Sequence, residues 1–139
     1  MENEGMGAGF GSRGDPDNAD RVVRITAFDI GYRPASVTVR RGETVKFVVT
    51  NKGRLRHELV LGPKSVQIAH DREMRNMTPT EMARDMKEDP NGIVVPPGET
   101  RTITWTFSGE RKKIQFACHV PGHYQAGMRG VIHIDGGAS

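Results

Sequence analysis

The chain has 139 residues and a formal net charge of +3, and its 35% of apolar residues include a single cysteine. This length suits one domain, and one cysteine excludes an internal disulfide framework. No apolar run approaches the roughly 20 residues of a membrane-spanning helix, and the aromatic residues are not interleaved with a basic run. The composition therefore argues against membrane insertion and against nucleic-acid binding.

Residues 1–20 are predicted to form a flexible N-terminal tail. They hold five glycines and five acidic side chains against one arginine, with no apolar periodicity. They also lack the apolar segment of a secretory signal peptide, which fits either a cytosolic chain or a mature secreted form. The expected domain, residues 21–139, carries 19 basic and 12 acidic residues, a formal charge of about +7. Such a body attracts an acidic partner.

From Arg21 onward the chain predicts β-strands. Apolar and polar residues alternate with a period of two in short runs that are rich in β-branched residues. Glycine and proline turn signals separate these runs, and their number predicts an all-β fold, a sandwich of about seven to eight mainly antiparallel strands. The runs cover residues 23–27, 37–39, 45–49, 57–61, 103–107, 114–118 and 132–134.

Residues 64–89 interrupt this pattern, and two short helices are expected there. The segment lacks alternation and is rich in helix formers. The stretch Thr78-Pro79-Thr80-Glu81 combines an N-cap residue, a proline at the first helical position and a capping-box glutamate, so the second helix should begin here. Pro90 ends it, because the residue before a proline disfavours helical geometry.

The last third of the chain places three potential metal ligands at steps of five residues. Cys118, His123 and Met128 lie in a loop rich in proline and glycine that follows a strand, and His57 opens another strand. Because Cys118 lies on the inward face of its strand, its sulfur should point to the end of the sandwich. Two imidazoles and a thiolate in one plane, with a distant thioether, form a mononuclear copper site for electron transfer.

These features resemble the cupredoxins, the type I copper proteins. The C-x4-H-x4-M loop, the upstream His57 and the phrases TVKFVVTNKG, HELVLG and VIHID carry the resemblance over roughly residues 22–135. The helical insertion and the sequence FACHVPGHYQAGM are most similar to bacterial periplasmic cupredoxins associated with copper resistance. The resemblance implies a Greek-key sandwich, a periplasmic protein and one copper ion per chain. It also implies equatorial ligands His57, Cys118 and His123, and Met128 as the axial ligand.

The sequence departs from many electron-transfer cupredoxins at Glu58. They have an asparagine after the first histidine ligand, where it ties the loops together near the cysteine sulfur. Hydrogen bonds around the ligands tune a metal site, so blue, green and reddish sites all stay open. The dinuclear relatives need a second loop cysteine, which this chain lacks. A mononuclear site is therefore expected.

Zinc binding and thiol catalysis are the two alternatives to copper for the same side chains. Zinc could take Cys118, His57, His123 and a water, but the positioned methionine has no purpose for zinc, and Cu(II) outcompetes zinc at most such sites. Thiol catalysis by Cys118 and His119 fits poorly, because adjacent strand residues point to opposite faces. His119 is therefore expected at the surface or behind the ligands, and His133 should face solvent. No enzyme activity is expected.

The helical insertion leaves a second metal site open. Its histidine and methionines recur at helical spacing, which fits either two amphipathic helices packed on the sandwich or a thioether-rich Cu(I) site. Binding of one copper per chain, even in excess Cu(I), would exclude the second reading. The residues concerned are His70, Met74, Met77, Met82 and Met86.

The expected function is one-electron transfer, copper tolerance, or both, in the bacterial periplasm. The alternative is a copper-sequestering or chaperone protein that uses the additional Met/His site. The expected partner is a redox protein that meets the exposed edge of His123, and an acidic one would suit the basic body. The ordinary explanation of Lys52, Arg54 and Arg56 is a solvated loop, and the functional alternative is a basic rim that orients an acidic partner. The protein is expected to be monomeric.

Overall fold

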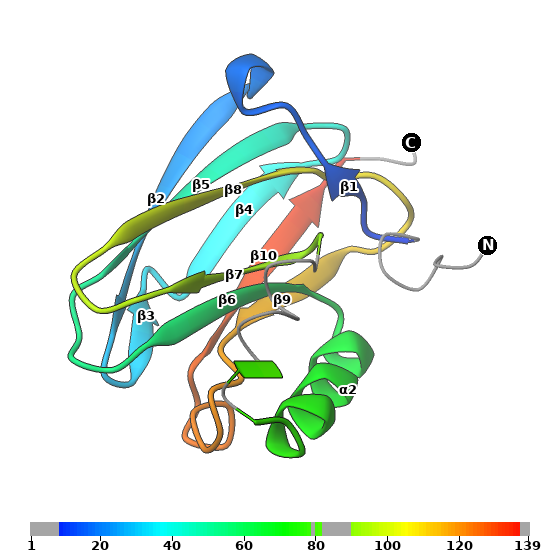
Figure 1. Ribbon diagram of the computed structural model, residues 1–139. Helices are drawn as coiled ribbons and strands as arrows, with labels where there is room; N and C mark the ends of the chain where they lie inside the picture. The colour runs from blue at the N-terminus through cyan, green and yellow to red at the C-terminus, as the bar shows by residue number, and fades with distance from the viewer. Residues whose placement is uncertain (1–8, 79, 82–89, 137–139) are drawn as a thin grey trace.

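Two β-sheets packed face to face form the body of the protein in a computed structural model (Figure 1). The structure describes residues 9–78, 80–81 and 90–136. The first sheet, in the order β1-β8-β5-β2-β3, consists of β1 (Ser12–Arg13), β2 (Arg21–Phe28), β3 (Gly31–Arg33), β5 (Thr44–Asn51) and β8 (Thr100–Thr106). The second, in the order β4-β10-β9-β6-β7, consists of β4 (Ser36–Arg40), β6 (His57–Gly62), β7 (Gly92–Val95), β9 (Lys113–Ala117) and β10 (Arg129–Asp135).

The predicted all-β Greek-key sandwich is confirmed. The described residues contain ten strands, more than the seven to eight expected, because β1, β3 and β7 are short pieces without an alternating pattern. The pairs β2–β5 and β4–β10 are parallel, whereas the other described pairs are antiparallel, so the mainly antiparallel prediction holds.

The core lies between the two sheets and follows from the period of two along each strand. In β5, the side chains of Val45, Phe47 and Val49 are buried while their neighbours are partly exposed. Aromatic side chains from both sheets complete the core. Tyr32 packs edge-on against Phe116, with ring centroids 5.0 Å apart, which joins the first sheet to the second.

Residues 9–20 belong to the folded body, although the sequence predicts a flexible tail over residues 1–20. Phe10 is fully buried and stacks on Trp105, with ring centroids 5.4 Å apart. The indole nitrogen of Trp105 donates a hydrogen bond to the backbone oxygen of Phe10 over 3.0 Å, and β1 pairs with β8. A single aromatic residue among glycines makes no periodic pattern, so this packing could not be predicted from the sequence. Residues 1–8 lie outside the described residues.

The helix α2 (Lys64–Arg75) covers the outer face of β6 and β9, as Figure 1 shows. This cover explains why every residue of β6 is buried, whereas a strand with one wet face would alternate. The buried side of α2 consists of Gln67, His70, Asp71 and Met74, at spacings of three, one and three residues that define one helical face. The first expected helix of the insertion is therefore confirmed.

The capping box expected at the start of the second helix is also present. The Thr78 backbone N–H donates to Glu81 Oε1 over 2.9 Å, and the Glu81 N–H donates to the Thr78 hydroxyl over 3.1 Å. Residues 82–89, where the rest of this helix was expected, lie outside the described residues. Within the part of the chain that is described, no helix is long and apolar enough to cross a membrane.

Candidate metal centre

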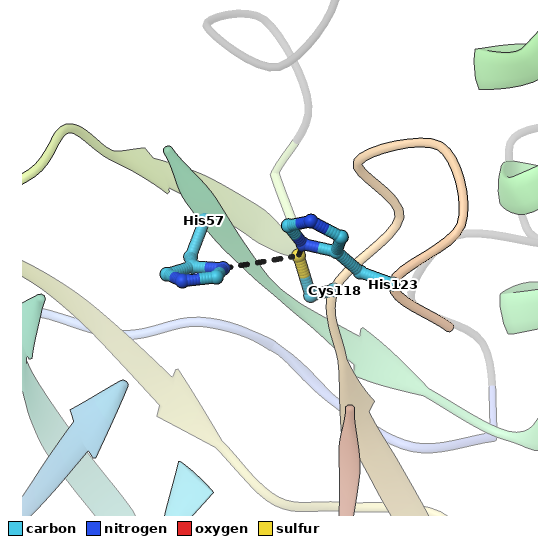
Figure 2. A group of neighbouring side chains, drawn as sticks. All are labelled: His57, Cys118 and His123. Carbon is cyan, nitrogen blue, oxygen red and sulfur yellow. Dashed lines mark hydrogen bonds between the residues drawn. The ribbon is translucent and has the colours of Figure 1, made fainter. Parts of the chain in front are cut away.

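The start of β6, the end of β9 and the loop after β9 bring three potential ligands together. Figure 2 shows His57 and His123 facing the sulfur of Cys118. The Sγ atom lies 3.9 Å from Nδ1 of His57 and 3.4 Å from Nδ1 of His123, and the three donor atoms all lie within 4.8 Å of one another. A thiol and two imidazole nitrogens thus converge on one point, with the spacing that a single metal ion can bridge.

Backbone hydrogen bonds fold the loop from Cys118 to Met128 back on itself. The Cys118 N–H donates to the Met128 carbonyl over 3.1 Å, and the Met128 N–H donates to the His123 carbonyl over 3.0 Å. Gly127 has a φ of +98°, in the left-handed region that glycine adopts without strain, and it lets the chain turn just before Met128. The Met128 side chain is fully buried. These backbone bonds therefore hold Met128, the fourth expected ligand, beside Cys118 and His123.

Asp29 orients His57. Its Oδ1 lies 2.7 Å from Nε2 of His57, which donates the hydrogen bond and leaves the lone pair of Nδ1 directed at the cluster. Asp29 also accepts backbone hydrogen bonds from Arg54 and Leu55, over 2.8 Å and 3.4 Å. The bond from Arg54, followed by the one from His57, lowers the pKa of the Asp29 carboxyl. Sequence reasoning missed Asp29, because it is 28 residues from His57 and no motif links them.

Glu58 fastens β6 to the ligand loop. Its backbone N–H donates to Cys118 Sγ over 3.4 Å, and its Oε1 accepts from the backbone N–H of His119 over 3.0 Å. The Tyr32 hydroxyl donates to the Glu58 carbonyl from the opposite sheet. The departure from asparagine therefore preserves both a hydrogen bond to the sulfur and a side-chain tie between the loops.

Comparison with known proteins assigns the chain to a family. A profile of copper-binding proteins, the plastocyanin/azurin family, matches residues 19–135. The chain belongs to this family. It is 36% identical to the copper-resistant cuproprotein CopI of Pseudomonas aeruginosa, covering 92% of this chain and 83% of that protein. It is 42% identical to the copper-resistant cuproprotein CopI of Rubrivivax gelatinosus, covering 88% of this chain and 72% of that protein.

Solved structures show the same cupredoxin fold. Auracyanin B superposes with a TM-score of 0.73 at 18% identity, covering 92% of this chain and 97% of auracyanin B. The auracyanin of Roseiflexus castenholzii superposes with a TM-score of 0.71 at 25% identity, covering 86% of this chain and all of that chain. The resemblance to cupredoxins close to copper-resistance proteins is therefore confirmed.

The donor set fits copper, one ion per chain, as the family implies. Thiolate favours Cu(I), imidazole binds both oxidation states, and both come from buried side chains here. Burial, followed by the negative charge of Glu58, raises the pKa of the Cys118 thiol to about 12. The metal must therefore displace a proton from Cys118 at neutral pH. Burial and then the neighbouring His57 lower the pKa of His123, which favours the neutral imidazole that a metal needs.

His119 was expected either at the surface or behind the ligands. It is fully buried, and its ring lies against α2 on the side of the chain opposite to Cys118. Its Nδ1 lies 2.9 Å from Asp71 Oδ1, and its Nε2 lies 2.6 Å from Gln67 Oε1. The alternation along the strand correctly placed it opposite Cys118, but α2 covers that outer face. Burial lowers the pKa of His119, and the hydrogen bond to the Asp71 carboxylate opposes this shift. His133 is exposed, as expected.

The residues suggested for a second site are only partly described. His70 and Met74 are buried on the inner face of α2, and Met77 is half-buried, whereas Met82 and Met86 lie outside the described residues. The ring of His70 packs against that of His119 with centroids 5.1 Å apart. Among the described residues, His57, Cys118 and His123 are the one group in which three His, Cys, Asp or Glu side chains converge. The second copper site stays a prediction.

Proposed function

We propose that this protein is a mononuclear type I copper protein whose ion is held by His57, Cys118 and His123, with Met128 as the axial ligand. The observation that carries the proposal is the convergence of the Nδ1 atoms of two buried histidines on the buried Cys118 sulfur. Bound copper supplies a one-electron redox centre. The hydrogen bond that His57 donates to Asp29, the one that the Glu58 backbone N–H donates to Cys118, and the backbone bonds across the loop keep the donor atoms in place in both oxidation states.

Electrons would enter and leave at His123. His57, Cys118 and Met128 are fully buried, whereas His123 is 6% exposed and is flanked by exposed Pro121 and Gly122. A partner that approaches this edge comes closest to the metal, and the rate of electron transfer falls steeply with distance.

A basic rim near this edge favours an acidic partner. Lys52 and Arg54 are exposed on the loop between β5 and β6, and Arg56 immediately precedes His57. Complementary charges chiefly raise the association rate and make it depend on salt. Replacing Arg54 and Arg56 with glutamine should slow reduction by an acidic redox protein and flatten its salt dependence. Unchanged kinetics would contradict this part of the proposal.

We propose copper tolerance in the bacterial periplasm as the setting in which the site works. The support is the similarity to two copper-resistant cuproproteins of bacteria. Four protein ligands would saturate the ion and leave no position for a substrate, which argues against an enzyme. A monomer is the simplest form for such a carrier. Loss of the gene should sensitise cells to copper. If the protein were instead a dedicated electron carrier, loss of the gene should impair respiration or another redox pathway without copper stress.

The decisive experiment is the visible absorption spectrum of the Cu(II)-loaded protein. An intense band from charge transfer between the Cys118 thiolate and copper is expected. Cys118→Ala and His123→Ala should each abolish it, and His133→Ala, which changes an exposed histidine on β10, is the matched control. A loaded protein without the band, or a band that survives Cys118→Ala, would overturn the proposal.

A further inference from the structure

Resting on the proposed copper function, we infer that helix α2 clamps the ligand loop through Asp71. The loop has two arms, the first beginning at Cys118 and the second following His123. The Asp71 carboxylate joins them, because it contacts His119 on the first arm and Gln125 on the second. Asp71 is therefore a positioning residue for the copper ligands, although it touches none of them.

The first arm is held at His119, the residue next to Cys118. Asp71 Oδ1 lies 2.9 Å from the His119 ring, and Gln67 Oε1 lies 2.6 Å from the other ring nitrogen. The backbone N–H of His119 donates to Glu58. These contacts hold a fully buried residue that is joined directly to Cys118 by a peptide bond, so His119 cannot turn without moving the ligand.

Gln67 is itself anchored, which makes the support under His119 rigid. Its amide nitrogen contacts the carbonyl oxygens of Val60, Gly62 and Gln115, at 2.8 Å, 3.2 Å and 3.3 Å. Because its NH₂ group serves these carbonyls of β6 and β9, its oxygen must face His119. Gln67 of α2 therefore contacts both the second sheet and His119.

The second arm is held at Gln125, two residues after His123. The amide of Gln125 donates to Asp71 Oδ2 over 2.7 Å, so each oxygen of one carboxylate serves one arm. Between the arms, the ring of Tyr124 packs on that of His119 with centroids 4.8 Å apart. The Asp71 side chain is only 5% exposed, and buried hydrogen bonds to a carboxylate are stronger than exposed ones.

The consequence is that the two arms cannot separate independently. The backbone bonds close the loop at the Cys118 and Met128 ends, whereas Asp71 closes it on the side that faces α2. By holding both arms, Asp71 narrows the range of distances between Cys118 Sγ and His123 Nδ1. The two donor atoms should therefore move less when the redox state of the copper changes. The insertion that contains α2 thereby serves the copper site mechanically and needs no metal of its own.

The test is Asp71→Ala, with Glu73→Ala as the matched control, because Glu73 is an exposed carboxylate on the same helix. In the copper-loaded protein, Asp71→Ala should shift and broaden the thiolate-to-copper band and move the redox potential. It should also speed copper release to a chelator about tenfold, as expected from the loss of about 1.4 kcal/mol of hydrogen bonding. Asp71→Asn keeps an oxygen for His119, and its new amide N–H can bond the Gln125 amide oxygen once that amide is turned over, so this variant should restore most of the wild-type spectrum. Glu73→Ala should match the wild type.

Gln125→Ala keeps the test decisive if Asp71→Ala does not fold. Gln125 is exposed, so its truncation should leave the sandwich intact and still release the second arm. Without metal, both variants should exchange amide hydrogens at residues 118–128 faster than the wild type. Wild-type spectra, release rates and exchange in Gln125→Ala would overturn the inference. A wild-type protein without the thiolate-to-copper band would instead overturn the proposed function, while the exchange measured without metal still decides the clamp.

Discussion

Two clusters of buried histidines lie on opposite sides of the chain where β9 ends. The thiol cluster consists of His57, Cys118 and His123. The helix cluster consists of His119 with the α2 residues Gln67, His70, Asp71 and Met74. In the thiol cluster, the Nδ1 atoms of both histidines face a sulfur atom. In the helix cluster, each nitrogen of His119 meets an oxygen acceptor. Burial of histidines therefore does not by itself indicate a metal site; lone pairs that converge do.

The difference arises from one step along the backbone. Cys118 points between the sheets, where β6 contributes His57, and His119 points outward, where α2 contributes Gln67 and Asp71. Opposite faces of one extended segment thus carry the metal site and its support.

The largest effect is expected from removing one histidine from each cluster. His57→Ala should weaken copper binding by more than about 100-fold, because losing a ligand costs more than losing a group that merely supports one. His70→Ala should leave the affinity within about twofold. Competition with a Cu(I) chelator measures both. A comparable loss in His70→Ala, or a second copper bound per chain in the wild type, would show that the helix cluster also holds metal.

The buried thiol should make the metal-free protein sensitive to alkali. The pKa of Cys118 in the folded protein, about 12, lies above its ordinary value of 9.0. The neutral thiol therefore makes its full contribution to the free energy of unfolding below pH 9. This stabilisation is lost as the pH rises toward 12, and roughly 2 kcal/mol should be gone by about pH 10.5. Urea unfolding of the wild type and Cys118→Ser over this range isolates the effect, because serine does not ionise. Parallel decline in both proteins would contradict the assigned cause.

A smaller effect is expected from exchanging one buried thioether in each region. Met128→Leu should raise the redox potential and shift the visible spectrum, because it replaces a sulfur donor with a purely apolar wall. Met74→Leu should change neither, and each exchange should cost less than about 1.5 kcal/mol of stability because volume is conserved. Potentiometry and spectra of the two variants check this. Equal shifts in both would contradict the assignment of Met128.

The smallest effect concerns Glu58, which touches both clusters. Glu58→Gln keeps an oxygen for the His119 N–H but removes a negative charge near the sulfur. The potential should rise on the order of tens of millivolts, because the more positive Cu(II) state loses favourable charge. In the metal-free variant, the pKa of Cys118 should fall, since the charge of Glu58 helps to raise it. Thiol titration by absorbance checks the second effect, and an unchanged thiol pKa would contradict it.

The thiol cluster could be anticipated because its signal is local. Cys118 and His123 recur at a five-residue step with Met128 in one loop, and the strand pattern shows which way Cys118 points. His57 carried a weaker signal, a histidine at the start of another strand, because 61 residues separate it from Cys118. Asp29 left no signal, because a single aspartate in a loop looks like any other turn residue.

The helix cluster could be anticipated only in part. The spacing of Gln67, His70, Asp71 and Met74 marks one face of α2, but three of these residues are polar, so the pattern does not distinguish a buried face from a solvent-exposed one. Alternation correctly placed His119 opposite Cys118, yet it could not show that a helix from an insertion covers that side. Packing between segments distant in sequence decides both, and a single sequence does not record it.

The stacking of Phe10 on Trp105 provides a built-in optical reporter. Trp105 is the single tryptophan of the chain and pairs with Val45, at the end of β5 opposite Asn51, from which the loop toward His57 departs. Its fluorescence therefore reports the release of the N-terminal segment at one end of the sandwich. The visible band reports the metal at the other end. Recording both signals on one unlabelled sample would reveal whether the two ends melt together or one after the other.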